Sequence, residues 1–266
     1  MKSFAVALSL IASVFQPMIP SNAQTPTSKS TMVVAHRGAS GYAPENTLAA
    51  AKLGWQQGAH AVEVDVHLSS DNKIVVIHDK NTKRTSGKDL PVRQTRYDQL
   101  KVLDVGLWKD EKYIGEQIPL LEDIVNAIPD GKKLVVEIKS EKKIVKVIEQ
   151  KFRNHPKVNQ LIFIAFDYET ILEAKKSFPE NKAFWLSSKF QSGVESILEK
   201  VKRDGLDGVD LNYRIIDMEL MKIAREVGVE VHTWTVNDIG RAWELRRLGV
   251  ESITTDYPDK ILEVVK

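Results

Sequence analysis

Short apolar runs rich in β-branched residues recur along the chain, and amphipathic stretches separate most of them. The runs that have the length and composition of buried β-strands are Met32–His36, Ala61–His67, Lys133–Lys139, Leu161–Phe166, Ala183–Leu186, Gly208–Leu211, Val229–Trp234 and Ser252–Thr255. Helical periodicity predicts connecting helices at Asn46–Gln57, Leu121–Ala127, Glu141–Arg153, Tyr168–Ser177, Val194–Arg203, Asp217–Glu226 and Asp238–Arg247. Such alternation predicts right-handed crossovers and a parallel sheet, and its eight strand–helix units favour a closed α/β barrel over an open sheet.

One stretch interrupts this alternation. Lys73–His78 is a further short strand, which follows Ala61–His67 through a turn at Asp71-Asn72. Residues 79–117 are then polar and contain several glycines. A loop of this length is usually functional or forms a small inserted segment. We expect its apolar side chains to pack against the rim of the barrel; they are Leu90, Leu100, Leu103, Val105, Leu107 and Trp108.

The N-terminus has the pattern of a signal peptide. Lys2 precedes an apolar run from Phe4 to Phe15, and Ser21-Asn22-Ala23 supplies small residues at a cleavage site. The run is shorter than the roughly 20 residues that a membrane span needs. We therefore expect a signal peptide over residues 1–23 and a single mature domain over 24–266, secreted or periplasmic, with no transmembrane segment.

Composition narrows the class of protein. A length of 266 residues suits one α/β barrel, which takes about 250. The 38 Lys and Arg against 36 Asp and Glu leave a net charge of +2, which excludes a strongly basic nucleic-acid footprint. The absence of cysteine excludes a disulfide scaffold, thiolate metal ligands and a cysteine nucleophile. Composition gives no prediction of oligomeric state.

Carboxylates interrupt two of the predicted strands. Glu63 and Asp65 are two residues apart and point to the same face, as do Glu137 and Lys139. Burying such groups is costly unless a cation or hydrogen bonds compensate. An all-oxygen set suits a hard divalent ion, Ca²⁺ or Mg²⁺. Buried salt bridges with Lys139 or Arg37 explain the pattern equally well, and both interpretations stay open at this point.

Two histidines stand where strands end. His36-Arg37 closes the first strand, and His78-Asp79 closes the short strand that begins at Lys73. Two imidazoles flanking a phosphodiester form an acid–base pair, and an arginine fork suits a phosphate. His232, within a strand, is predicted to serve barrel packing.

These residues belong to a longer series of motifs that occur in one order. The series is His36-Arg37-Gly38, Pro44-Glu45-Asn46-Thr47, Glu63-Val64-Asp65-Val66, Val75–Asp79, Ile118–Glu122, Glu137-Ile138-Lys139, Trp234–Asn237 and Thr254–Pro258. In this series the chain resembles the glycerophosphodiester phosphodiesterase family, over essentially the whole mature sequence. The resemblance implies a TIM (β/α)8 barrel with a short inserted segment after the second barrel strand, which matches residues 79–117.

The resemblance also implies residue roles. It makes His36 and His78 the catalytic acid–base pair, and it implies that the start of the first helix, Asn46-Thr47, helps to order the site. The remaining roles that it implies are metal ligation by Glu63, Asp65 and Glu137, phosphate contacts by Arg37 and Lys139, and packing of Trp234 against the glycerol or alcohol group of the substrate.

The expected activity is metal-dependent hydrolysis of small glycerophosphodiesters to an alcohol and glycerol 3-phosphate. An alternative on the same scaffold is a lipid phosphodiesterase, of the lysophospholipase D or sphingomyelinase D kind, which needs an apolar groove for an acyl chain. A phosphodiester-binding protein without catalysis is a third possibility. It is disfavoured because both histidines and all three carboxylates are present.

Overall fold

The computed structural model describes residues 1, 30–139, 142–190 and 193–265. The signal peptide expected over residues 1–23 therefore lies, apart from Met1, outside the described residues. Within the described ranges, no helix combines the length and the apolar character that crossing a membrane requires.

Eight parallel strands close into a barrel, because β1 pairs with both β2 and β9. The barrel strands are β1 (Met32–Ala35), β2 (Ala61–Leu68), β4 (Lys133–Ile138), β5 (Leu161–Ala165), β6 (Lys182–Ser187), β7 (Gly208–Asn212), β8 (Glu230–Trp234) and β9 (Ser252–Thr255). Every predicted barrel strand is present, with each end within one residue of its predicted position. The predicted TIM barrel is confirmed.

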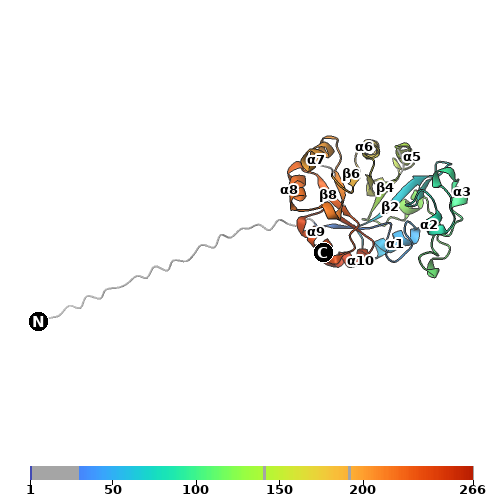
Figure 1. Ribbon diagram of the computed structural model, residues 1–266, viewed down its shortest axis with the longest axis horizontal. Coiled ribbons are helices and arrows are strands. Elements are labelled where there is room, and N and C mark those ends of the chain that lie inside the picture. Colours follow the sequence, from blue (N-terminus) through green and yellow to red (C-terminus); the bar gives the residue numbers. More distant parts are fainter. Residues whose placement is uncertain (2–29, 140–141, 191–192, 266) are drawn as a thin grey trace.

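Helices form an outer ring around the strands (Figure 1). The ring consists of α1 (Leu48–Gln56), α4 (Leu121–Ala127), α5 (Lys143–Phe152), α6 (Tyr168–Ser177), α7 (Val194–Arg203), α8 (Met218–Val227), α9 (Ile239–Leu248) and α10 (Pro258–Val265). The seven predicted helices are present, although Glu141, predicted as the first residue of α5, lies outside the described residues; α10 was not predicted. The sequence features that could have predicted α10 are a proline at its first position and apolar residues spaced to face the barrel, Ile261, Leu262 and Val265.

Alternation along the strands separates an outer core from the barrel interior. Val62, Val64 and Val66 on β2 face outward and are buried among helix side chains. The intervening residues Glu63 and Asp65 point inward. A smaller apolar cluster fills the barrel; it consists of Val34, Ala61, Val135, Ile162, Ile164, Phe184 and Leu186. Inward-facing polar side chains are therefore left to gather near the carboxyl ends of the strands.

The segment after β2 lies beside the barrel, near α1 (Figure 1). It contains β3 (Ile74–Val76), which pairs antiparallel with β2, followed by α2 (Lys83–Ser86), α3 (Tyr97–Leu100) and short 3-10 turns at Val92–Gln94 and Glu111–Tyr113. Further 3-10 turns elsewhere in the chain are Val158–Gln160 and Tyr213–Ile215. An apolar cluster packs residues 79–117 against β3 and the residues that flank them; it is made of Val75, Ile77, Val92, Leu100, Leu103, Val105 and Ile118.

Two of the side chains expected to pack on the rim are instead exposed. Leu107 and Trp108 are 52% and 42% exposed, so the prediction was wrong for them. The carboxylate of Asp104 accepts from the backbone N–H groups of Gly106 and Leu107, which folds a turn outward. The indole of Trp108 donates to the carbonyl of Val105 and lies near cationic side chains rather than in the core.

Candidate active site

The polar residues at the carboxyl ends of the strands surround one cavity of about 210 Å³. Seven of the eight predicted site residues line it, namely His36, Arg37, Glu63, His78, Glu137, Lys139 and Trp234. The eighth, Asp65, contacts Arg37 and Lys139 from beside the cavity. This end of the barrel is where TIM-barrel enzymes place their active sites.

Three carboxylates converge from two neighbouring strands. Asp65 on β2 pairs with Glu137 on β4 in the parallel register, and Glu63 is two residues before Asp65. All three are buried, and one oxygen of each lies within 4.8 Å of the others. Oε2 of Glu63 accepts from the backbone N–H of Arg37 at 2.9 Å, whereas its Oε1 has no hydrogen-bond partner in the described part of the chain. The convergence that the strand spacing predicted is therefore present.

Burial and neighbouring charges shift the pKa values of these three carboxyl groups in different directions. Burial, together with Asp65 and Glu137, raises the pKa of Glu63 well above its ordinary value. Burial and the charge of Asp65 raise the pKa of Glu137 to about 7. Burial also opposes ionisation of Asp65, but Arg37 and Lys139 outweigh it and lower its pKa to about 2. An ionised carboxylate thus lies beside two that favour a proton, and a divalent cation would favour the ionised form of all three.

Two cations lie among the carboxylates. Nε of Arg37 is 3.3 Å from Oδ2 of Asp65, and its Nη1 donates to Oε1 of Glu45 at 2.9 Å. Nζ of Lys139 is 2.8 Å from Oε1 of Glu137 and 3.4 Å from Oδ1 of Asp65. The salt bridges that the sequence offered as one explanation of these carboxylates are therefore present, and the divalent cation that it offered as the other stays a prediction.

The loop between β1 and α1 lies beside the carboxylate cluster and orders it. Gly38 has a φ of +82°, and a Cβ there would lie 2.3 Å from the backbone carbon of Ala50, so only glycine fits. Nδ2 of Asn46 donates to Oδ2 of Asp65 at 2.8 Å, and its Oδ1 accepts from the backbone N–H of Asp65 at 3.0 Å. The next residue, Thr47, caps α1 by accepting from the N–H of Ala50. The predicted part of Asn46-Thr47 in ordering the site is consistent with these contacts.

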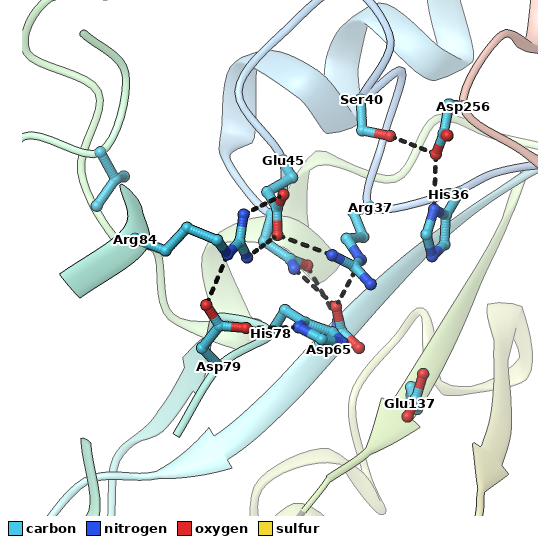
Figure 2. Close-up of polar contacts among 12 residues, drawn as sticks. His36, Arg37, Ser40, Glu45, Asp65, His78, Asp79, Arg84, Glu137 and Asp256 are labelled. Atoms are coloured by element: carbon cyan, nitrogen blue, oxygen red, sulfur yellow. Dashed lines mark hydrogen bonds and ion pairs between the residues drawn. The ribbon is translucent and has the colours of Figure 1, made fainter. Parts of the chain in front are cut away.

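His36 is held by a carboxylate from the far end of the chain. Its Nδ1 lies 2.7 Å from Oδ1 of Asp256, which follows β9 (Figure 2). Although burial opposes ionisation, hydrogen bonds from His36, Asn237 and Ser40 hold the pKa of Asp256 well below its ordinary value. Because an ionised carboxylate only accepts, Nδ1 of His36 is the donor, and Nε2 remains as its second exchangeable position.

His78 has a similar arrangement with its neighbour in sequence. Its Nδ1 lies 2.7 Å from Oδ1 of Asp79, and Nε of Arg84 donates to the other oxygen of Asp79 at 2.7 Å. Arg84 also donates to both oxygens of Glu45, which links the inserted segment to the β1–α1 loop (Figure 2). Nε2 of His67 donates to the carbonyl of His78 at 3.1 Å. Burial lowers the pKa of the His78 imidazole.

Trp234 and Phe166 form a less polar part of the cavity lining. Trp234, at the end of β8, meets the ring of Phe166 edge-on with centroids 5.5 Å apart. Its indole donates to the backbone carbonyl of Asp210 at 3.1 Å. Ile164 and Leu186 complete this wall.

Several residues of the site had no role in the sequence prediction. Asp256 and Glu45 stand in the recognised motifs, and Asp79 directly follows His78, so their positions were a usable signal. Arg84 and Asp210 carried no comparable signal, because their contacts depend on how the inserted segment and β7 are placed in three dimensions.

The chain matches the model of the glycerophosphoryl diester phosphodiesterase family over residues 36–260. It is 32% identical to a glycerophosphodiester phosphodiesterase from Caldanaerobacter subterraneus over 245 residues, which covers 89% of this chain and 98% of the relative. A lysophospholipase D from Mus musculus is 28% identical over 272 residues, covering 86% and 84% of the two chains.

Among solved structures, the fold resembles that of a phosphodiesterase from Oleispira antarctica in complex with the product sn-glycerol-3-phosphate. The TM-score is 0.82 and the identity 32%, with 88% of this chain and 96% of the other covered. Family model, sequence relatives and structural neighbour agree over nearly the whole barrel. The chain therefore belongs to the glycerophosphoryl diester phosphodiesterase family, and it is a phosphodiesterase.

Proposed function

We propose that the protein hydrolyses small glycerophosphodiesters, adding water across one phosphorus–oxygen bond to release an alcohol and sn-glycerol 3-phosphate. The observation that carries the proposal is a cavity in which two carboxylate-tethered imidazoles accompany a buried carboxylate cluster. The relatives named as glycerophosphodiester phosphodiesterases support the substrate class, as does the product bound to the structural neighbour.

The carboxylate cluster fits a divalent cation, which we propose to be Ca²⁺ or Mg²⁺ held by Glu63, Asp65 and Glu137. The fit rests on the donor set, which is all oxygen, on its mutual spacing within 4.8 Å and on the oxygen of Glu63 that lacks a hydrogen-bond partner among the described residues. When bound, such an ion balances the buried negative charge and polarises the phosphoryl oxygens of the diester.

Arg37 and Lys139 are proposed to bind the phosphate. Both line the cavity, and both carry N–H groups that suit phosphoryl oxygens. Their ion pairs with Asp65 hold the two cations in place before the substrate arrives. They therefore stabilise negative charge that develops on the phosphoryl group without a large rearrangement.

His36 and His78 are proposed to move the protons. Each holds Nδ1 at 2.7 Å from a carboxylate, which fixes the ring and leaves Nε2 to exchange a proton with the substrate or water. One imidazole accepts the proton of the nucleophile, which is either water or a glycerol hydroxyl that first forms a cyclic phosphate, whose ring water then opens. The other imidazole gives a proton to the departing alkoxide.

A lysophospholipase D activity is a second candidate, and the relative from Mus musculus favours it. Trp234, Phe166, Ile164 and Leu186 give the cavity of about 210 Å³ an apolar wall, and a cavity of about 560 Å³ shares Glu137, Lys139 and Phe166 with it. The proposed test compares kcat/KM for glycerophosphocholine with that for lysophosphatidylcholine, with Ca²⁺ or Mg²⁺ supplied.

We expect glycerophosphocholine to be the better substrate by at least about 10-fold in kcat/KM, a free-energy difference of about 1.4 kcal/mol, because the relative named as a glycerophosphodiester phosphodiesterase shares more identity with this chain than the lysophospholipase D does. A preference for the lipid would contradict the proposal in favour of lysophospholipase D. Failure to hydrolyse either diester with either ion would favour a binding protein without catalysis.

A further inference from the structure

One polar group in the cavity takes no part in the chemistry described above. Asp210, on β7, is 3% exposed and lines the cavity. Its Oδ1 has no hydrogen-bond partner within residues 30–139, 142–190 and 193–265. Counting around the closed sheet, β7 is four strands from β2, so Asp210 lies across the barrel from Glu63 and Asp65.

The surroundings of Asp210 make this group costly in the free protein. Ile164, Leu186 and Trp234 line the same part of the cavity, and none offers a side-chain donor to the carboxyl oxygen, because the indole N–H of Trp234 is already bonded to the backbone carbonyl of Asp210. A buried polar atom without a partner destabilises the folded state. Because Asp210 lines the substrate cavity, a bound ligand can supply the missing donor.

We propose that Asp210 determines specificity by accepting a hydrogen bond from the terminal hydroxyl of the glycerol group of the substrate. The inference rests on the proposed function, and it adds the part of the substrate that the β7 side of the cavity recognises. The phosphate lies near Arg37 and Lys139, so the glycerol extends across the barrel toward β7.

A hydroxyl fits this position better than a quaternary ammonium group does. A trimethylammonium group has no hydrogen to donate and would leave Oδ1 of Asp210 unpaired. A hydroxyl satisfies that oxygen whether the carboxyl group is ionised or neutral. The alcohol half varies among glycerophosphodiesters and needs room toward solvent, whereas the glycerol half is constant and suits a small enclosed site.

The proposal has a direct consequence for lipid substrates. In a lysophospholipid an acyl group replaces the hydrogen of the terminal glycerol hydroxyl, so no donor reaches Asp210. A site built to bind a hydroxyl discriminates strongly against an analogue that lacks it, because its own polar group is left buried and unpaired. Asp210 would therefore select glycerophosphodiesters over lysophospholipids.

The test compares two substrates and three proteins, all loaded with the divalent ion. The substrates are glycerophosphocholine and its analogue in which propane-1,2-diol replaces glycerol, so that only the terminal hydroxyl is missing. The proteins are the wild type, Asp210→Leu and the control Ser252→Ala. Ser252 also has a buried oxygen without a partner among the described residues, but it lies at the start of β9 and does not line the cavity.

We expect the wild type to prefer glycerophosphocholine by about 10- to 100-fold in kcat/KM, as one hydrogen bond to a buried carboxyl group implies. Asp210→Leu should lose most of this preference by losing activity on glycerophosphocholine alone, whereas Ser252→Ala should keep it. Asp210→Asn retains an acceptor oxygen and should keep most of the preference, which preserves the test if the leucine variant does not fold.

Equal losses on both substrates in Asp210→Leu would overturn the proposal, as would a wild type without the preference. A third substrate, glycerophosphoethanolamine, separates the two halves of the diester. If the loss in Asp210→Leu depends on the head group instead of the glycerol hydroxyl, Asp210 binds the head group and the assignment is wrong. Failure of the proposed function itself would look different, because the wild type would then hydrolyse none of the glycerophosphodiesters.

Discussion

His36 and His78, the two histidines proposed to be catalytic, are held by carboxylates in different surroundings. Asp256 accepts from His36, Ser40 and Asn237, of which the last two are neutral donors. Asp79, which holds His78, is also paired with the guanidinium of Arg84. The negative charge beside His36 is therefore less compensated than the charge beside His78, and the orientation of His36 depends on one carboxylate.

Replacing Asp256 with Asn should lower kcat by roughly 100-fold, at the low end of what general acid–base catalysis supplies, because the amide no longer fixes the ring and tautomer of His36. KM should change little, since Asp256 does not line the cavity. Steady-state kinetics on glycerophosphocholine would measure both constants. Asp259→Asn is the matched control, because Asp259 accepts from Tyr42 on the same side of the barrel without touching a histidine. An unchanged kcat in Asp256→Asn would contradict the positioning of His36 by this carboxylate.

At the scale of elements, the start of α1 joins the fold to the site. Thr47 caps the helix and also donates to the carbonyl of Pro44 at 2.7 Å, and the preceding Asn46 holds Asp65 through two hydrogen bonds. Asn46 has a φ of +59°, a left-handed conformation that asparagine tolerates better than most residues. The helix therefore begins where the geometry of the carboxylate cluster requires it.

Thr47→Ala should lower the free energy of unfolding by about 1 kcal/mol through loss of the N-cap hydrogen bond. Thr47→Ser keeps the hydroxyl and should lose much less. Urea denaturation followed by circular dichroism would give both values. Equal destabilisation in the two variants would show that the methyl group of Thr47, rather than its capping hydroxyl, stabilises this turn.

Part of the candidate site could be predicted from the spacing of residues along the strands. Strand period fixed the inward direction of Glu63, Asp65 and Glu137, because one side chain in two faces the barrel interior. Strand period could not predict contacts between distant parts of the chain. His36 and Asp256 are 220 residues apart and meet only because β1 pairs with β9. The exposure of Trp108 and the missing partner of Asp210 likewise depend on three-dimensional packing, which no local pattern encodes.

At the scale of the whole molecule, ion pairs also link strands away from the site. Nζ of Lys182 at the start of β6 lies 2.5 Å from Oε1 of Glu230 at the start of β8, and Nε2 of His232 lies 3.5 Å from Oε2 of Glu230. The buried ring of His232 stacks on Phe184 with centroids 3.8 Å apart, so its predicted packing role is confirmed. The hydrogen bond from His232 and the nearby Lys182 lower the pKa of Glu230 to about 2, because together they outweigh the opposing effect of burial.

This lowered pKa predicts a contribution to acid stability. A carboxyl group whose pKa is lower in the folded than in the unfolded state stabilises the fold above its unfolded pKa, about 4.5, and loses that contribution as pH falls toward 2. Glu230→Gln should therefore be less stable than the wild type at pH 7, by on the order of 1 kcal/mol for a partly exposed pair. The difference should shrink between pH 4.5 and 2 in urea denaturation. A difference that is constant over this range would contradict the prediction.

The barrel brings the three buried carboxylates Glu63, Asp65 and Glu137 to one end, where the cations Arg37 and Lys139 compensate them only in part. We propose that a divalent cation completes this cluster for phosphodiester hydrolysis. The most direct measurement follows glycerophosphocholine hydrolysis by metal-stripped protein before and after Ca²⁺ or Mg²⁺ is restored, with ion affinity measured by calorimetry for the wild type, Glu63→Gln and the control Asp259→Asn. We expect the stripped wild type and control to be inactive and to recover with an added ion, whereas Glu63→Gln should bind the ion more weakly and recover less. Full activity of the stripped wild type, or unchanged ion affinity in Glu63→Gln, would contradict it.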